Sequence, residues 1–143
     1  MNSVLNINVI QNPDDELIQF LSNKIVEFNM ARWEVTERLP IAVTITSDDG
    51  RILGGASGRT FGNWLLLERL WVDDAQRGNQ LGVTLLAQIE NAAQTRGCTM
   101  CLLDTLNFQA KPFYEKYGYQ VEWVQSDYPK TGCKYFMTKQ LVV

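Results

Sequence analysis

The spacing of apolar and polar residues predicts an alternating series of strands and helices. Apolar runs and apolar–polar alternation indicate seven strands, at residues 4–10, 41–46, 51–60, 64–72, 98–104, 119–125 and 134–141. Asp49-Gly50 is typical of a hairpin turn between the second and third strands, and Gly62-Asn63 predicts another turn before the fourth.

Apolar residues at helical spacing predict three helices, at residues 12–30, 80–96 and 108–117. Gly97 and Gly118 are suited to end the second and third of them. Pro112 has no amide hydrogen and fits only the first turn of a helix, so the third helix should start at Phe108 or Gln109.

This order of elements indicates an α/β (α+β) fold. The strand, helix and strand across residues 64–104 predict one parallel pair, whereas the hairpins elsewhere predict antiparallel pairing. We therefore expect a mixed, mostly antiparallel sheet with helices on both faces. No repeat or linker interrupts the chain, so residues 1–143 are predicted to form a single domain.

The composition narrows the chemistry, because the 143 residues include no histidine. Ser-His-Asp and Cys-His nucleophile systems are excluded, so acid–base catalysis must use Glu, Asp, Tyr, Cys, Lys or water. A net charge of −3 without a basic cluster argues against a nucleic-acid partner. No segment has the length of a membrane span, and the N-terminus does not resemble a signal peptide. We expect a soluble, cytoplasmic protein with no membrane partner.

The three cysteines do not indicate a disulfide framework. Cys98 and Cys101 have C-x-x-C spacing, but they lie in a predicted buried strand, where residues three apart face opposite sides. A structural role is therefore favoured over a redox or zinc site, and no metal is expected.

A strand, a short polar loop and a helix meet at residues 70–82. The first turn of a helix has unpaired amides at the positive end of the helix dipole, which favours an anion. Gly78 would allow close approach of a phosphate, and Arg77 would add a positive charge. Gly78 could also serve only the turn, and the segment is neither a G-x-G-x-x-G motif nor a P-loop.

Two segments resemble motifs of the GCN5-related N-acetyltransferase (GNAT) family. The family's acetyl-CoA loop, Arg/Gln-x-x-Gly-x-Gly/Ala, is similar to Arg77-Gly78-Asn79-Gln80-Leu81-Gly82, with Gln80 in place of the usual glycine. The family's Asn-…-Ala-…-Phe-Tyr-Glu-Lys-x-Gly-Phe/Tyr segment resembles residues 107–119 (NFQAKPFYEKYGY). The order of elements agrees over nearly the whole chain.

The resemblance implies an enzyme that moves an acetyl group from acetyl-CoA directly to a primary amine in a ternary complex. It also implies that the two central parallel strands splay apart and that the pantetheine arm enters the gap. The residues that it assigns to acetyl-CoA are Leu70, Trp71, Val72, Arg77, Gly78, Asn79, Gln80, Leu81, Gly82, Asn107 and Phe113.

Two residues are candidates for catalysis. Tyr114 matches the family's usual acid near the thioester sulfur, although it could instead be an aromatic packed on the sheet. Glu68 is a candidate base, because a carboxylate inside an apolar strand calls for a reason, and burial would raise its pKa toward neutrality. The alternatives for Glu68 are a solvated strand edge and an ion pair with Arg69.

The acceptor is predicted to be a small-molecule amine. By resemblance, its pocket would use Trp33 and Glu34 after the first helix and Tyr128 before the last strand. A protein or peptide amine and a non-catalytic CoA-binding role are the alternatives. A homodimer is a further expectation, because dimers are common in the family.

Overall fold

The computed structural model describes residues 3–142. The chain forms two compact units, Met1–Thr36 and Glu37–Val143. Within the described residues, no helix is both long enough and apolar enough to cross a membrane. The single domain, the cytoplasmic location and the homodimer stay predictions.

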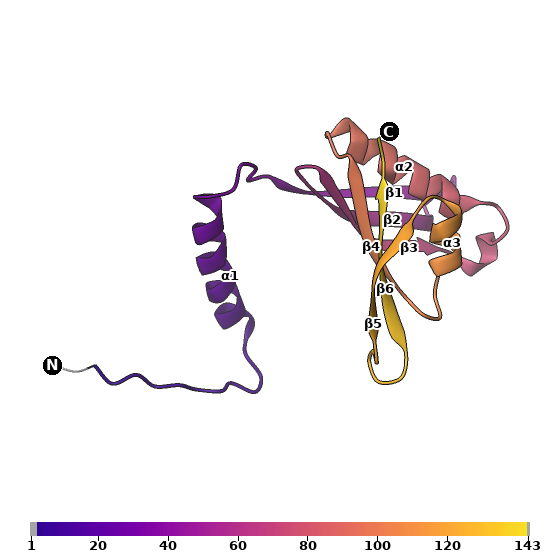
Figure 1. The fold of residues 1–143 in the computed structure, drawn as a ribbon. Helices are drawn as coiled ribbons and strands as arrows, with labels where there is room; N and C mark the ends of the chain where they lie inside the picture. The colour runs from indigo at the N-terminus through magenta and orange to yellow at the C-terminus, as the bar shows by residue number, and fades with distance from the viewer. Residues whose placement is uncertain (1–2, 143) are drawn as a thin grey trace. The chain divides into compact units, whose positions relative to one another are not determined.

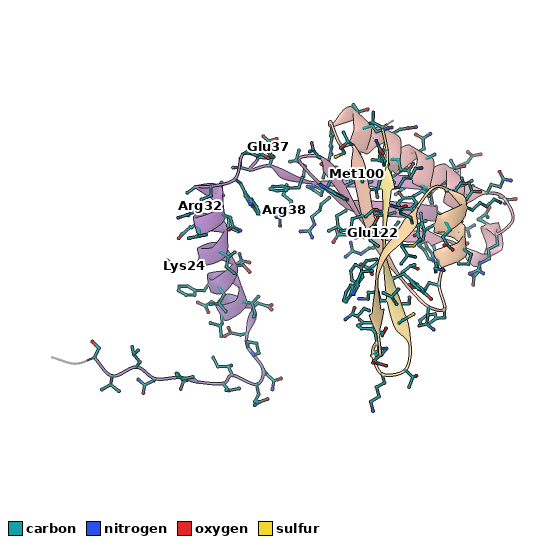
Figure 2. The ribbon with its side chains drawn as sticks, in the orientation of Figure 1. Lys24, Arg32, Glu37, Arg38, Met100 and Glu122 are labelled. Atoms are coloured by element: carbon teal, nitrogen blue, oxygen red, sulfur yellow. The ribbon has the colours of Figure 1, made fainter. Side chains whose placement is uncertain are left out.

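The first unit contains one helix, α1 (Asp15–Met30). Asp14 caps it, because its carboxylate accepts a hydrogen bond of 2.8 Å from the Leu17 amide. Arg32 follows the helix and lies over the Phe28 ring, 3.7 Å from its centroid (Figure 2). The strand predicted at residues 4–10 is wrong, since this segment forms no ladder with another strand. Apolar alternation alone does not make a strand when the backbone groups have no partner.

The second unit is built on a six-stranded sheet with the order β1-β2-β3-β4-β6-β5 (Figure 1). Only β3 and β4 run parallel, and every other neighbouring pair is antiparallel. This is the predicted mixed sheet with one parallel pair. The strands are β1 (Arg38–Thr46), β2 (Ile52–Phe61), β3 (Trp64–Val72), β4 (Met100–Leu106), β5 (Gln120–Ser126) and β6 (Cys133–Gln140).

Two helices of the second unit share one core with the sheet. They are α2 (Leu81–Thr95), which follows the 3-10 turn η1 (Asp74–Gln76), and α3 (Lys111–Lys116). Their packing confirms the apolar stripe that predicted α2. The largest fully buried side chains are Leu65, Leu85, Leu86, Ile89, Leu103, Met137, Cys98 and Cys101. The predicted covering of both sheet faces stays a prediction, because α1 belongs to the first unit.

The third helix starts later than predicted, at Lys111 rather than Phe108 or Gln109. The preceding residues are held in a turn by side-chain hydrogen bonds. The Leu106 amide donates to Gln109 Oε1 over 2.8 Å, and the Ala110 amide donates to Thr105 Oγ1 over 3.2 Å. These bonds compete with helix formation.

Candidate active site

The parallel strands β3 and β4 separate after a short ladder. They pair only at Trp64 with Met100, Leu65 with Cys101, and Leu66 with Leu102. Beyond these pairs lies a cavity of about 540 Å³, which we call the β3–β4 cavity. It is lined by residues 67–71 of β3, residues 103–106 of β4, and Gln109, Ala110, Tyr114, Tyr128 and Lys134.

A β-bulge in β3 shapes one wall of this cavity. The register with β2 shifts between Ser57 and Gly58, which leaves Glu68 as the extra residue. The neighbouring Leu67 is buried in the core, while Glu68 and Arg69 are both exposed. A bulge bends its strand and redirects side chains. Here it turns two successive charged side chains away from the core and toward the cavity wall.

Tyr114 enters the cavity from the helix side. It lies in α3, its side chain is 7% exposed, and it packs edge-on against Phe113 and Tyr119. Burial, with smaller contributions from Cys101 and Asp104, raises the pKa of Tyr114 to about 12. The phenol is therefore protonated at neutral pH. It can donate a proton or a hydrogen bond inside the cavity, and it also packs in the core.

Glu68 forms an ion pair, but with a different arginine from the one that its sequence neighbours suggested. Glu68 Oε1 lies 3.4 Å from Nε of Arg59 on β2, rather than pairing with Arg69. The Glu68 side chain is 30% exposed. A carboxylate at this position is open to the cavity on one side and fixed by a cation on the other.

The loop before α2 surrounds a second hollow of about 430 Å³, which we call the loop hollow. The predicted acetyl-CoA residues divide between the two spaces. Those that line the loop hollow are Val72, Arg77, Gly78, Gln80, Leu81, Gly82 and Phe113. Leu70 and Trp71 line the β3–β4 cavity, and Asn79 bonds instead to the Gln76 side chain over 3.3 Å.

The amides at the start of α2 favour an anion in the loop hollow. The hydrogen bonds at this junction use the amides of Arg77, Asn79 and Thr84. Within residues 3–142, the first-turn amides of Leu81, Gly82 and Val83 have no such partner. Arg77 is exposed and pairs with Asp74 over 2.9 Å, so its charge is mobile enough to reach a bound anion.

Gln80 has a left-handed backbone, with φ 59° and ψ 28°. This geometry explains why glycine is usual at this position in the family, since a Cβ is disfavoured there. Sequence analysis noted the missing glycine without its conformational consequence.

We expect Gln80→Gly to stabilise the protein by about 0.5–1 kcal/mol, because relief of the left-handed strain exceeds the entropy lost by glycine. Urea unfolding measures the change. Gln76→Gly, four residues earlier and outside the left-handed region, should lower stability instead. A decrease for both variants would contradict the strain at Gln80.

Asn107 is engaged with the protein itself. Its Oδ1 accepts a hydrogen bond of 3.2 Å from the Cys133 amide, and its amide donates to the Cys133 carbonyl over 3.0 Å. These bonds fix the β5–β6 connection against the end of β4. The predicted contact of Asn107 with the pantetheine arm stays a prediction.

The predicted acceptor residues fall into different units. Tyr128 lines the β3–β4 cavity, and the ammonium of Lys134 lies over its ring, 4.2 Å from the centroid. Trp33 and Glu34 belong to the first unit. Their part in the acceptor site stays a prediction.

A buried polar network escaped the sequence analysis. Glu90 of α2 accepts a hydrogen bond of 2.8 Å from the Tyr119 hydroxyl and pairs with Lys139 of β6 at 2.8 Å. Burial is the largest cause that raises the pKa of Tyr119 well above its usual range. The signal was present, because Glu90 lies four residues after Leu86 and three before Ala93, on the buried face of the helix.

The two cysteines of the C-x-x-C sequence are both buried, and their thiols are free. Burial raises the pKa of Cys101 to about 12, so this thiol is protonated at neutral pH. A protonated, buried thiol is a poor nucleophile and a poor metal ligand.

Comparison with known proteins identifies the family. The model of the acetyltransferase (GNAT) family matches residues 6–119. An acetyltransferase of Agrobacterium fabrum is 35% identical over 106 residues, which cover 74% of this chain and 77% of that protein. Blasticidin-S acetyltransferase of Streptomyces morookaense is 34% identical over 116 residues, with coverages of 78% and 85%.

The fold is also found among solved structures. The crystal structure of an acetyltransferase from Bacillus cereus has a TM-score of 0.84 and 31% sequence identity, and the match covers 93% of this chain and 97% of that one. The α+β fold, the GNAT resemblance and the acyltransferase class are thereby confirmed. The chain belongs to the GNAT family of acetyltransferases.

Proposed function

We propose that this protein is an acetyl-CoA-dependent N-acetyltransferase that acts on a small-molecule amine. The observation that carries the proposal is the β3–β4 cavity, because it places Glu68 of β3 and Tyr114 of α3 in one space. A carboxylate that accepts a proton and a phenol that donates one are the two groups that amine acetylation needs.

The loop hollow fits the pyrophosphate of acetyl-CoA. It combines the free amides at the start of α2 with the Arg77 charge, and Lys116 adds a second cation to its lining. Val72 and Phe113 of this hollow directly adjoin Trp71 and Tyr114 of the β3–β4 cavity in the chain. A ligand with a phosphate end and an extended arm could therefore occupy both spaces.

The residues would share the work of acetyl transfer. Acetyl-CoA supplies a reactive thioester, and the acceptor amine must lose a proton to attack it. Glu68, directly or through water, would accept that proton. Exposed amides along the open edge of β3 would stabilise the oxyanion as the amine attacks, and Tyr114 would protonate the departing thiolate.

Two observations favour a small acceptor. The cavity volume of about 540 Å³ is typical of sites for small molecules. A relative with 34% identity is a blasticidin-S acetyltransferase, whose name gives a small molecule as its acceptor.

Gly82→Ala separates ligand contact from folding. A Cβ at Gly82 would meet Phe113 at 3.5 Å, which is ordinary contact, and alanine is the better helix former. We expect the free energy of unfolding to stay the same or rise. The Kd for acetyl-CoA should increase about tenfold, or ~1.4 kcal/mol, because the methyl group occupies the loop hollow.

Calorimetric titration and urea unfolding test this expectation. Gly97→Ala is the matched control, because Gly97 has φ +96° and lies outside both cavities. It should lower stability and leave the Kd unchanged. Unchanged acetyl-CoA binding by Gly82→Ala would argue against a pyrophosphate in the loop hollow.

Glu68→Gln tests the base. We expect kcat to fall about 100-fold or more, with little change in the KM for acetyl-CoA, because the amide cannot accept the proton. Steady-state kinetics over a range of pH measures the effect. Glu115→Gln removes an exposed carboxylate of the Lys111–Glu115 ion pair and should leave kcat unchanged. A normal rate for Glu68→Gln at every pH would remove Glu68 from the mechanism.

The proposed function itself is tested by binding and by turnover. Acetyl-CoA at about 100 times its Kd should stabilise the protein by roughly 2.7 kcal/mol, which a thermal shift detects. Thiol release is then measured with small amines, aminoglycosides, amino acids and peptides as acceptors. Absence of a shift would overturn the proposal. A shift without thiol release would favour a CoA-binding role, and turnover of peptides alone would favour a peptide acceptor.

A further inference from the structure

Asp104 of β4 faces the β3–β4 cavity from the side of the sheet opposite the helices. Its neighbours in the strand, Leu103 and Thr105, are both buried, so alternation turns Asp104 to the other face. Its position in the strand corresponds to that of Glu68. Each lies two residues beyond the last paired residues, Leu66 and Leu102, on its side of the gap.

The Asp104 carboxylate has no cation as its partner among residues 3–142. Glu68, in contrast, is paired with Arg59. Asp104 also contributes to the raised pKa of Tyr114, which indicates that its charge acts inside the cavity. An ionised side chain in a cavity without a counter-charge is favourable to a cationic ligand.

Aromatic side chains adjoin Asp104 on the same face. Phe136 of β6 lies directly opposite Asp104 in the antiparallel register, and Trp123 of β5 lies opposite Phe136. The two rings are in contact, with centroids 5.3 Å apart, and the tryptophan is 58% exposed. Aromatic faces next to a carboxylate favour an ammonium or guanidinium group.

The geometry points to Asp104 as the residue that selects the acceptor, by binding a second cationic group of a diamine while Glu68 receives the proton of the reacting amine. This inference rests on the proposed acetyl transfer. Asp104 acts here as a positioning residue, because it would not touch the amine that is acetylated.

Two cations on the cavity wall support the opposite choice of acceptor. Arg69 and Lys134 both line the β3–β4 cavity and could bind an anionic group instead. The Lys134 ammonium already lies over the Tyr128 ring. Arg69 follows Glu68 directly in β3, on the other wall from Asp104. Asp104 is therefore free to bind a cation at the β4 wall.

The test compares Asp104→Asn with the unaltered protein on two acceptors of similar length, an α,ω-diaminoalkane and the matching monoaminoalkane. We expect the KM for the diamine to rise roughly ten- to hundredfold, as for a lost hydrogen bond to a charged group. The KM for the monoamine and the KM for acetyl-CoA should change less than twofold. Asp104→Glu should restore part of the preference for the diamine.

Glu122→Gln is the matched control. Glu122, labelled on β5 in Figure 2, accepts hydrogen bonds from Thr138 Oγ1 and Gln120 Nε2 and does not line the cavity. It makes the same change of charge as Asp104→Asn and should leave the KM for the diamine unchanged. An equal effect of Asp104→Asn on both acceptors would overturn the inference.

Further outcomes distinguish the inference from the function on which it rests. If the protein binds and uses acetyl-CoA but Asp104→Asn leaves the diamine KM unchanged, the inference fails and the proposed function stands. If Lys134→Met raises the KM of the productive acceptor and Asp104→Asn does not, the acceptor has an anionic group and the inference is wrong. If acetyl-CoA produces no thermal shift, the proposed function fails and the inference falls with it.

Discussion

Tyr114→Phe is expected to lower kcat by about 100-fold or more while the protein stays folded, since a general acid contributes 10²–10⁴-fold to a rate. The change removes one hydroxyl from a side chain that is otherwise packed among Phe113 and Tyr119. The ring contacts are kept, so the loss falls on the chemical step. The KM for acetyl-CoA should change little.

The pH dependence of the unaltered protein gives a second measurement. Because the pKa of Tyr114 is about 12, its phenol stays protonated up to about pH 11, and kcat should not decline between pH 8 and 10 through loss of this proton. Tyr135→Phe is the control, since Tyr135 lies outside the β3–β4 cavity and should keep full activity. A rate for Tyr114→Phe within threefold of the original would leave Tyr114 with its packing role alone.

Lys139→Met should produce the largest loss of stability. Methionine keeps the apolar stem that packs against Gly118, but it leaves the buried carboxylate of Glu90 without its cation. The side chains of Lys139 and Glu90 are only 25% and 11% exposed. Breaking such a pair costs about 3 kcal/mol, which lowers the Tm by roughly 10 °C in a chain of this size.

Scanning calorimetry and urea unfolding measure this loss. Lys24→Met breaks the exposed Lys24–Glu27 pair and should change stability by less than about 0.5 kcal/mol. Adding Glu90→Gln to Lys139→Met should recover part of the loss, because the uncompensated charge is removed while the amide oxygen still accepts from Tyr119. Equal losses for Lys24→Met and Lys139→Met would show that burial of the pair is unimportant.

Sequence reasoning located most elements, since the strands of the sheet and α2 have strong local patterns. It failed at residues 4–10, where apolar alternation was present but no neighbouring strand pairs with it. It also placed the start of α3 too early, because the hydrogen bonds of Gln109 and Thr105 depend on the fold of the turn.

The site was predicted in its residue types more fully than in its connections. The motif resemblance pointed to Tyr114 and the loop before α2, and both line cavities. The partner of Glu68 could not be found from sequence, because Arg59 reaches it through the register of β2 with β3 and a bulge. Asp104 gave no signal of its own, since its meaning depends on where two distant strands stop pairing.

The interrupted ladder between β3 and β4 also bears on the kinetic independence of the two substrates. Tyr114 reaches the cavity from the helix side, while Asp104 faces it from the other side of the sheet. A donor and an acceptor that enter through different faces can bind and leave in either order. Changes in acceptor specificity could then accumulate on one face of the sheet, with little effect on how the donor is held at the other.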